Sequence, residues 1–395
     1  MGWQTTVDLD RFALTACGYL ASKAAENTLL LSAMQAARSA QGSRATAQEP
    51  GGGWLFGWWE PPGGGEPRGA FLHDPAAPLL ASSLVPEMAA SLAATLAKMS
   101  RPVLGVDAPT DAADAFAAAW SQRAGLVARV HRHCHVYRIA GPGVGPGGVP
   151  GPPPPPGRAL PGAAAWSPPQ PPVPPGRLRI ATASDQQLLA DWLAAFANET
   201  AERMDSPLDL AADLISYGGA VFWEAPQRPG RPRDAAHFLP GSRHRDAKPA
   251  SEPSGQPAAL ATLTRPTAGV IRISMLYTPP DRRHRGYASA VTMAVSRAVL
   301  SGPASPGPAP DGSGPAGSAP DGPASPGPAS PGGRVDEIVL ITDRNRPDSW
   351  AIRLGYQLVN ERAVFRFGPV TGPMSRMART GPMPRLPTGP LPRRP

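Results

Sequence analysis

The chain has 395 residues and a formal net charge of +8, with 54 prolines and 43 glycines. Five arginines follow Gly368, which leaves +3 on the rest and argues against a nucleic-acid partner. No apolar run reaches the roughly 18 residues of a membrane span. The two cysteines, Cys17 and Cys134, form no C-x-x-C pair, which argues against a disulfide framework. We therefore predict a cytoplasmic protein without a nucleic-acid or membrane partner.

The first part of the chain, residues 1–140, has the pattern of an α/β domain. Apolar stripes predict its helices, and short apolar runs between turn residues predict its strands. The expected elements are two helices within 8–37, strands at 54–60, 69–72 and 79–82, a helix at 86–99, a strand at 103–106, a helix at 111–123 and a long strand at 126–139.

Three histidines stand at alternate positions of the last of these strands. His131, His133 and His135 should share one face, with Cys134 on the other. Same-face histidines can bind zinc, but no second ligand cluster is present, so we predict a half-exposed strand and no metal site. The tryptophans between residues 54 and 59 belong either to the core or to the wall of a substrate pocket. A nucleic-acid stacking platform would need basic residues between them.

Proline, glycine and repeats divide the rest of the chain. Residues 141–176 form a Pro-rich linker, which is either a semi-rigid spacer or a ligand for a proline-binding partner. A second domain is expected over residues 177–368. Its low-complexity insert at 302–333 and the Arg/Pro tail at 369–395 are too poor in apolar residues to fold. The elements expected in it are strands at 178–181, 220–224, 258–264, 270–278, 335–342 and 357–367 and helices at 185–199, 208–217, 286–300 and 348–354.

One connection in the second domain has the pattern of an anion site. The strand at 270–278 ends at two prolines, and a basic turn with Gly286 leads into the helix at 286–300. A helix N-terminus presents free N–H groups and the positive end of the helix dipole, so this turn suits a phosphate group.

These elements together resemble the GNAT superfamily of N-acetyltransferases. The family signature is Gln or Arg, two residues, Gly, one residue, and then Gly or Ala. Residues 283–288 fit it, and Thr342-Asp343 and Leu354-Gly355-Tyr356 fit the elements that follow. The whole chain resembles actinobacterial proteins with two GNAT-like halves. The implied fold is a mixed α/β sheet in two GNAT-like domains joined by the linker, of which the first has no Arg-x-x-Gly turn and should bind no CoA.

The resemblance implies acetyl-CoA as co-substrate. Main-chain groups of residues 276–278 would pair with its pantetheine arm, and the N–H groups of residues 283–288 would bind its pyrophosphate. The acetyl carbonyl would lie between this strand and the strand at 335–342. The implied acetyl-CoA-binding residues are Leu276, Tyr277, Thr278, Arg283, His284, Arg285, Gly286, Tyr287, Ala288 and Ser289.

The chemistry expected is direct attack of an amine on the acetyl thioester. Glu224, at a strand end, is a candidate base, and the alternative is a solvated carboxylate. Asp343 and Asn345 are either helix caps or catalytic. The family's tyrosine acid is missing from residues 348–354, where Trp350 stands in the place of an Asn, and His284 stands where many relatives have Gly.

Two functions follow from these observations. The first is an N-acetyltransferase that acts on a small-molecule or protein primary amine. The second is an acyl-CoA-binding protein with attenuated or lost transfer, which acts as a sensor or is an evolutionary relic.

Overall fold

The computed structural model describes residues 2–43, 53–141, 172–200, 202, 204–226, 255–301, 335–345 and 349–369. The linker up to residue 171, most of the loop between Glu224 and the following strand, the insert at 302–333 and the tail from residue 370 lie outside these ranges. The predictions for those segments therefore stay predictions.

The described part of the N-terminal half follows the predicted order of elements, with one strand more. Gly2–Thr6 forms β1 at the edge of the sheet, which the sequence did not predict. The remaining elements are α1 (Leu9–Ser22), α2 (Thr28–Ser43), β2 (Leu55–Glu60), β3 (Ala70–His73), β4 (Leu79–Ala81), α3 (Pro86–Lys98), β5 (Gly105–Pro109), α4 (Thr110–Ala124) and β6 (Val127–Ala140).

The C-terminal half repeats this pattern of strands and helices. Its elements are β7 (Arg177–Ile180), η1 (Ala183–Asp185), α5 (Gln186–Thr200), α6 (Pro207–Ser216), β8 (Ala220–Ala225), β9 (Gln256–Leu263), β10 (Val270–Tyr277), η2 (Pro280–Arg282), α7 (Tyr287–Leu300), β11 (Glu337–Asp343), α8 (Ser349–Arg353) and β12 (Gln357–Gly368). The predicted mixed α/β fold is confirmed.

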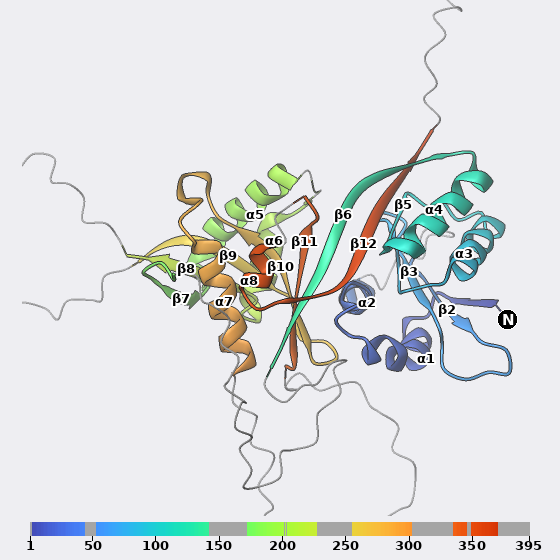
Figure 1. Ribbon diagram of the computed structural model, residues 1–395, viewed down its shortest axis with the longest axis horizontal. Coiled ribbons are helices and arrows are strands. Elements are labelled where there is room, and N and C mark those ends of the chain that lie inside the picture. The colour runs from blue at the N-terminus through green and yellow to red at the C-terminus, as the bar shows by residue number, and fades with distance from the viewer. Residues whose placement is uncertain are drawn as a thin grey trace, which may run out of the picture.

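The two halves share one twelve-stranded sheet, in which they exchange their last strands. The strand order is β1-β2-β3-β4-β5-β12-β6-β11-β10-β9-β8-β7. Strand β12 thus lies between β5 and β6, and β6 lies between β12 and β11. Figure 1 shows β6 and β12 running side by side through the middle of the molecule. Each half therefore needs a strand of the other to complete its part of the sheet.

Two ion pairs, each with one buried and one partly buried side chain, join the exchanged strands to their neighbours. Arg362 of β12 is 2% exposed, and its Nε donates to Asp107 Oδ1 of β5 at 2.9 Å. Arg138 Nη1 of β6 donates to Glu337 Oε1 of β11 at 2.7 Å. A buried charge, Arg362 in one pair and Glu337 in the other, is costly without a partner, so each pair favours the strand that lies beside it.

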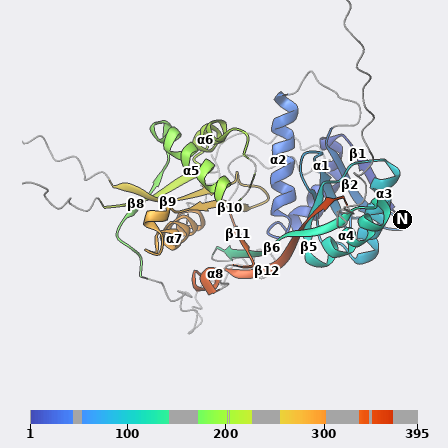
Figure 2. The same ribbon diagram turned by 90° about the horizontal axis from the view of Figure 1, so that it is seen from above.

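Helices cover both faces of the sheet. The cores separate into α3 with α4, α7 with α8, α1 with α2, and α5 with α6. Helix α2 also spans the junction, because its Leu30 and Met34 share a core with Val270 of β10 and Val339 of β11. Figure 2 shows α2 standing between the helices of the two halves. No helix in the described ranges combines the length and apolar character that crossing a bilayer requires.

Candidate functional site

Strands β10 and β11 separate before they end. Their parallel pairing runs from Val270 and Glu337 to Ile273 and Leu340, although β10 continues to Tyr277 and β11 to Asp343. The main chain beyond Ile273 therefore borders a gap in the sheet, where the sequence predicts that the acetyl group lies.

A β-bulge accounts for the separation. The register between β10 and β9 shifts between Ile273 and Met275, and a bulge bends the strand that carries it. Thr262 of β9 holds the bulge, since its Oγ1 accepts the N–H of Met275 at 3.0 Å and lies 2.8 Å from Ser274 Oγ. Successive N–H groups of a strand point to opposite sides, so the N–H of Leu276 is directed at the gap.

The N-terminus of α7 lies beside this gap with its donors open. Gly286 is the N-cap residue at φ 81°, and no side chain caps the helix. The first bond within the helix runs from the N–H of Ala290 to the carbonyl of Gly286 at 2.9 Å. Within the described residues, the four N–H groups from Gly286 to Ser289 have no acceptor, and the buried Thr278 Oγ1 has no partner. These orphaned donors fit the pyrophosphate and the pantetheine arm of acetyl-CoA.

The arginines of the turn anchor it to the rest of the molecule. Arg283 Nε donates to the carbonyl of Thr278 at 2.9 Å, and its Nη2 lies 2.6 Å from both carboxylate oxygens of Glu199 on α5. Arg282 donates to the first residues of β9, and Arg285 donates to a carbonyl within the turn. The turn therefore offers backbone N–H groups to an anion, while its guanidinium groups hold it in place.

His284 adopts a left-handed conformation that favours glycine. Its φ is 61°, and its side chain is exposed. The left-handed region costs an L-residue roughly 1–2 kcal/mol. Several hydrogen bonds of the neighbouring arginines hold this conformation, which lets a His stand where many GNAT proteins have Gly.

Helix α8 approaches the cradle through Trp350. Its Nε1 donates to Ser289 Oγ in the first turn of α7 at 2.8 Å. Tyr356 is buried, its hydroxyl lies 2.8 Å from Ser296 Oγ, and burial raises its pKa far above the usual value. The Tyr356 hydroxyl is therefore poorly placed to protonate a leaving thiolate.

Glu224 is neither solvated nor free. It is 7% exposed, and its carboxylate lies 3.1 Å from Arg177 Nε and 2.5 Å from Arg179 Nε. Arg179 also pairs with Asp185 at 2.7 Å and holds the pKa of that carboxyl at about 2. The interpretation of Glu224 as a solvated strand end is wrong. Arg177 and Arg179 donate to its two carboxylate oxygens, so its catalytic role stays a prediction that the geometry does not favour.

The end of the linker lies against the cradle. A Cβ built on Gly286 would come within 3.6 Å of Pro174 Cδ and 4.0 Å of the carbonyl oxygen of Pro172. The Pro172–Pro174 segment therefore borders the N-terminus of α7, where the phosphate would bind. The spacer prediction for this segment did not include that contact.

The remaining polar candidates have structural partners. His135 of β6 is buried, its Nδ1 lies 3.4 Å from the hydroxyl of Tyr137, and its Nε2 lies 3.6 Å from Glu361. The described ranges contain no cluster of three His, Cys, Asp or Glu side chains that could hold a metal. Asp343 Oδ1 accepts the N–H of Asn345 at 2.8 Å, which makes a turn rather than a helix cap.

Sequence reasoning missed Glu199 and Thr262, which set the cradle and the bulge. Each acts on a segment far along the chain, and no local pattern marks such a pairing. The hydrogen bond from Trp350 to Ser289 was also not predicted, although the sequence indicates that Trp350 stands in the place of an Asn.

Of three comparisons with known proteins, the one with solved structures gives matches. No protein-family model matches the chain, and no curated protein matches its sequence. A GCN5-related N-acetyltransferase from Sphaerobacter thermophilus is similar in structure, with a TM-score of 0.47, 13% identity, and coverage of 92% of this chain and 95% of that one.

Two further solved structures are similar over nearly the whole chain. A Drosophila protein gives a TM-score of 0.48 at 12% identity, and a tandem GNAT protein from the clavulanic acid pathway gives 0.41 at 12% identity; each comparison covers 93% of this chain and 98% of the other. Identities and TM-scores this low carry no argument about activity. The structures similar to this chain thus include GNAT-family N-acetyltransferases and a tandem GNAT protein, the superfamily that its sequence resembles.

Proposed function

We propose that the C-terminal half is an acyl-CoA-dependent N-acetyltransferase that moves an acetyl group from acetyl-CoA to a primary amine. One observation carries this proposal. Strand β10 leaves β11 after Ile273, directly before the open N-terminus of α7. The gap and the free donors lie together, and the fit of residues 283–288 to the acyl-CoA signature supports the same ligand. The small-molecule or protein acceptor and the cytoplasmic location belong to the same proposal.

The chain's own groups would bind and orient the co-substrate, which supplies an activated acetyl thioester. The N–H groups from Gly286 to Ser289 would bind the pyrophosphate, and the main chain of residues 276–278, which does not pair with β11, would pair with the pantetheine amides. The N–H of Leu276 would donate to the carbonyl oxygen as it gains negative charge during attack by the amine. Preorganised donors of this kind typically contribute about 100-fold or more to the rate.

A second function has an observation of its own. Tyr356 is buried and bonded to Ser296, and Trp350 of α8 donates to Ser289 in the first turn of α7. These features favour an acyl-CoA-binding protein with attenuated transfer, because binding needs the N–H groups while fast transfer also needs a proton donor for the leaving thiolate.

Two measurements on the full chain separate these functions. Titration calorimetry with acetyl-CoA tests binding, and release of free CoA thiol over a panel of primary amines tests transfer. We expect binding and amine-dependent thiol release. Binding without release under any amine supports the second function, and the absence of binding contradicts both.

A further inference from the structure

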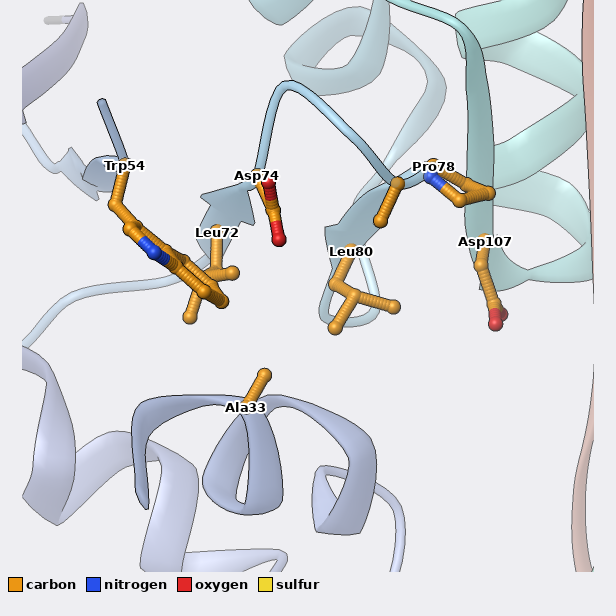
Figure 3. Close-up of a pocket in the computed structure, with 8 residues that line it drawn as sticks. Ala33, Trp54, Leu72, Asp74, Pro78, Leu80 and Asp107 are labelled. Carbon is orange, nitrogen blue, oxygen red and sulfur yellow. The ribbon is translucent and has the colours of Figure 1, made fainter. Parts of the chain in front are cut away.

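A pocket in the N-terminal half plays no part in the proposed acetyl transfer. It lies between α2 and the β3–β4 region and has a cavity volume of about 160 Å³, room for a small molecule but not for a drug-sized one. Figure 3 shows Trp54 and Asp74 pointing into this hollow, with Ala33 of α2 opposite them. Most of its lining is apolar, with Leu72 and Leu80 among the wall residues.

The aromatic wall of the pocket is held rigidly. The Trp54 ring stacks on Phe56 with centroids 6.2 Å apart and planes 8° apart. Phe56 in turn stacks on Phe12 at 5.3 Å, and both phenylalanines are fully buried. The indole therefore presents a fixed face. Tryptophan is the side chain whose ring attracts a cation most strongly.

The two carboxylates that line the pocket differ in their partners. Asp107 is neutralised by Arg362, whose Nε donates to it at 2.9 Å. Asp74 is half-buried, and its Oδ1 accepts only the N–H of Ala76, at 2.9 Å. In the described part of the chain Asp74 makes no ion pair. Burial, followed by the charge of Arg101, lowers the pKa of the adjacent His73 to about 4, so this histidine supplies no positive charge at neutral pH.

We infer that this pocket binds an organic monocation, a primary or quaternary ammonium group on an apolar body. The ammonium group lies between the Asp74 carboxylate and the face of Trp54, and the apolar body lies along Leu72 and Leu80. The charge on Asp74 selects a cation over a neutral molecule of the same shape, and the aromatic face adds a cation–π contribution.

The test titrates the full chain with three probes that share a six-carbon body: hexyltrimethylammonium, hexylamine and hexan-1-ol. A quaternary ammonium has no N–H to acylate, so its binding does not depend on acetyl transfer. We expect calorimetry to show binding of both cations and weaker binding of the alcohol. Failure of the proposed transferase activity would leave this result unchanged.

Asp74→Asn tests the charge, because the Asn oxygen can still accept the N–H of Ala76 and keep the turn. We expect the affinity for both cations to fall at least about tenfold and that for hexan-1-ol to stay the same. Asp114→Asn, on the exposed face of α4 and away from the pocket, is the matched control and should change neither affinity.

Two further variants test the walls. Trp54→Phe keeps a ring on Phe56 and should weaken cation binding about threefold, since Phe attracts cations less than Trp does. Ala33→Leu fills the hollow from α2 and should abolish binding of all three probes. The inference is overturned if neither cation binds at about 10 mM. Equal binding of the cations to the Asp74→Asn variant overturns it too, because it leaves only an apolar pocket.

Discussion

The connection between β4 and α3 is short and leads to a helix N-terminus that disfavours an anion. Its counterpart between β10 and α7 is longer and leads to a helix N-terminus with free N–H groups. Residues 82–85 form the first and residues 278–286 the second. Helix α3 begins with Pro86, which has no N–H, and carries Glu87 in its first turn, where it repels an anion. Helix α7 begins with Tyr287 and has no acidic residue in its first turn.

This difference teaches that a shared order of elements does not create a shared site. Both halves place a helix after a strand that pairs in parallel with the next strand. In the C-terminal half the bulge at Thr262 and the turn at Gly286 add a gap and free donors. In the N-terminal half the described site is the pocket at Asp74 and Trp54, on another part of the fold.

The largest effect is expected from Arg362→Met, which tests whether the two halves are separate units. It leaves the Asp107 carboxylate without its guanidinium partner and should cost about 3–5 kcal/mol of unfolding free energy. Because β12 joins the halves, urea denaturation should still show a single transition at a lower midpoint. Arg366→Met, exposed on the same strand, is the control. Two separate transitions would contradict the shared sheet.

Ala288→Glu gives α7 the acid that α3 already has. We expect acetyl-CoA affinity to fall about 100-fold, because a carboxylate occupies the anion position, while stability holds or rises since acids favour helix N-termini. Ala298→Glu adds the same charge at an exposed position later in α7 and should leave affinity intact. Calorimetry measures both, and equal affinities for the two variants would mean that the phosphate binds elsewhere.

Thr262→Val tests the bulge in β10. The structure describes no such bulge in β4, the corresponding strand of the N-terminal half. It removes the acceptor of the Met275 N–H and should cost about 1–3 kcal/mol of unfolding free energy. Release of the bulge should also allow β10 to move toward β11, so we expect slower thiol release. An unchanged melting temperature and rate would show that another contact sets the gap.

Features formed by residues close together in the chain could be predicted from the sequence, whereas contacts between distant residues could not. The cradle was predicted because its strand, its proline stop, its glycine and its helix are consecutive. The strand exchange was not, since β6 and β12 were each predicted only as the final strand of their own half and only non-local packing assigns their neighbours. Arg362 and Asp107 are 255 residues apart in the chain, and neither position carries a signal of the other. Glu224 was misread because its arginine partners lie on β7, which α5 and α6 separate from it along the chain.

A smaller effect concerns the linker that borders only the cradle of the C-terminal half. The double variant Pro172→Ser with Pro174→Ser loosens the segment against Gly286 and should raise acetyl-CoA affinity about threefold, because less order is lost on its displacement. Pro175→Ser is the matched control. A loss of affinity in the double variant would show instead that the segment forms part of the site.

The smallest effect is expected from His284→Gly, which relieves a left-handed residue. We expect about 0.5 kcal/mol of added stability, the relief being partly offset by the freedom that Gly gains in the unfolded chain. Ser100→Gly makes the same change at φ 52° in the N-terminal half. Thermal denaturation compares them, and a change of acetyl-CoA affinity should appear only in His284→Gly. An altered acetyl-CoA affinity in Ser100→Gly would contradict the assignment of the acetyl-CoA site to the C-terminal half.

Hydrogen exchange with and without acetyl-CoA tests the central claim most directly, because it assigns the ligand to one half. The account predicts slower exchange at residues 276–289, where free N–H groups gain acceptors, and no change at residues 79–88. Protection at residues 79–88, or none at 276–289, would contradict it.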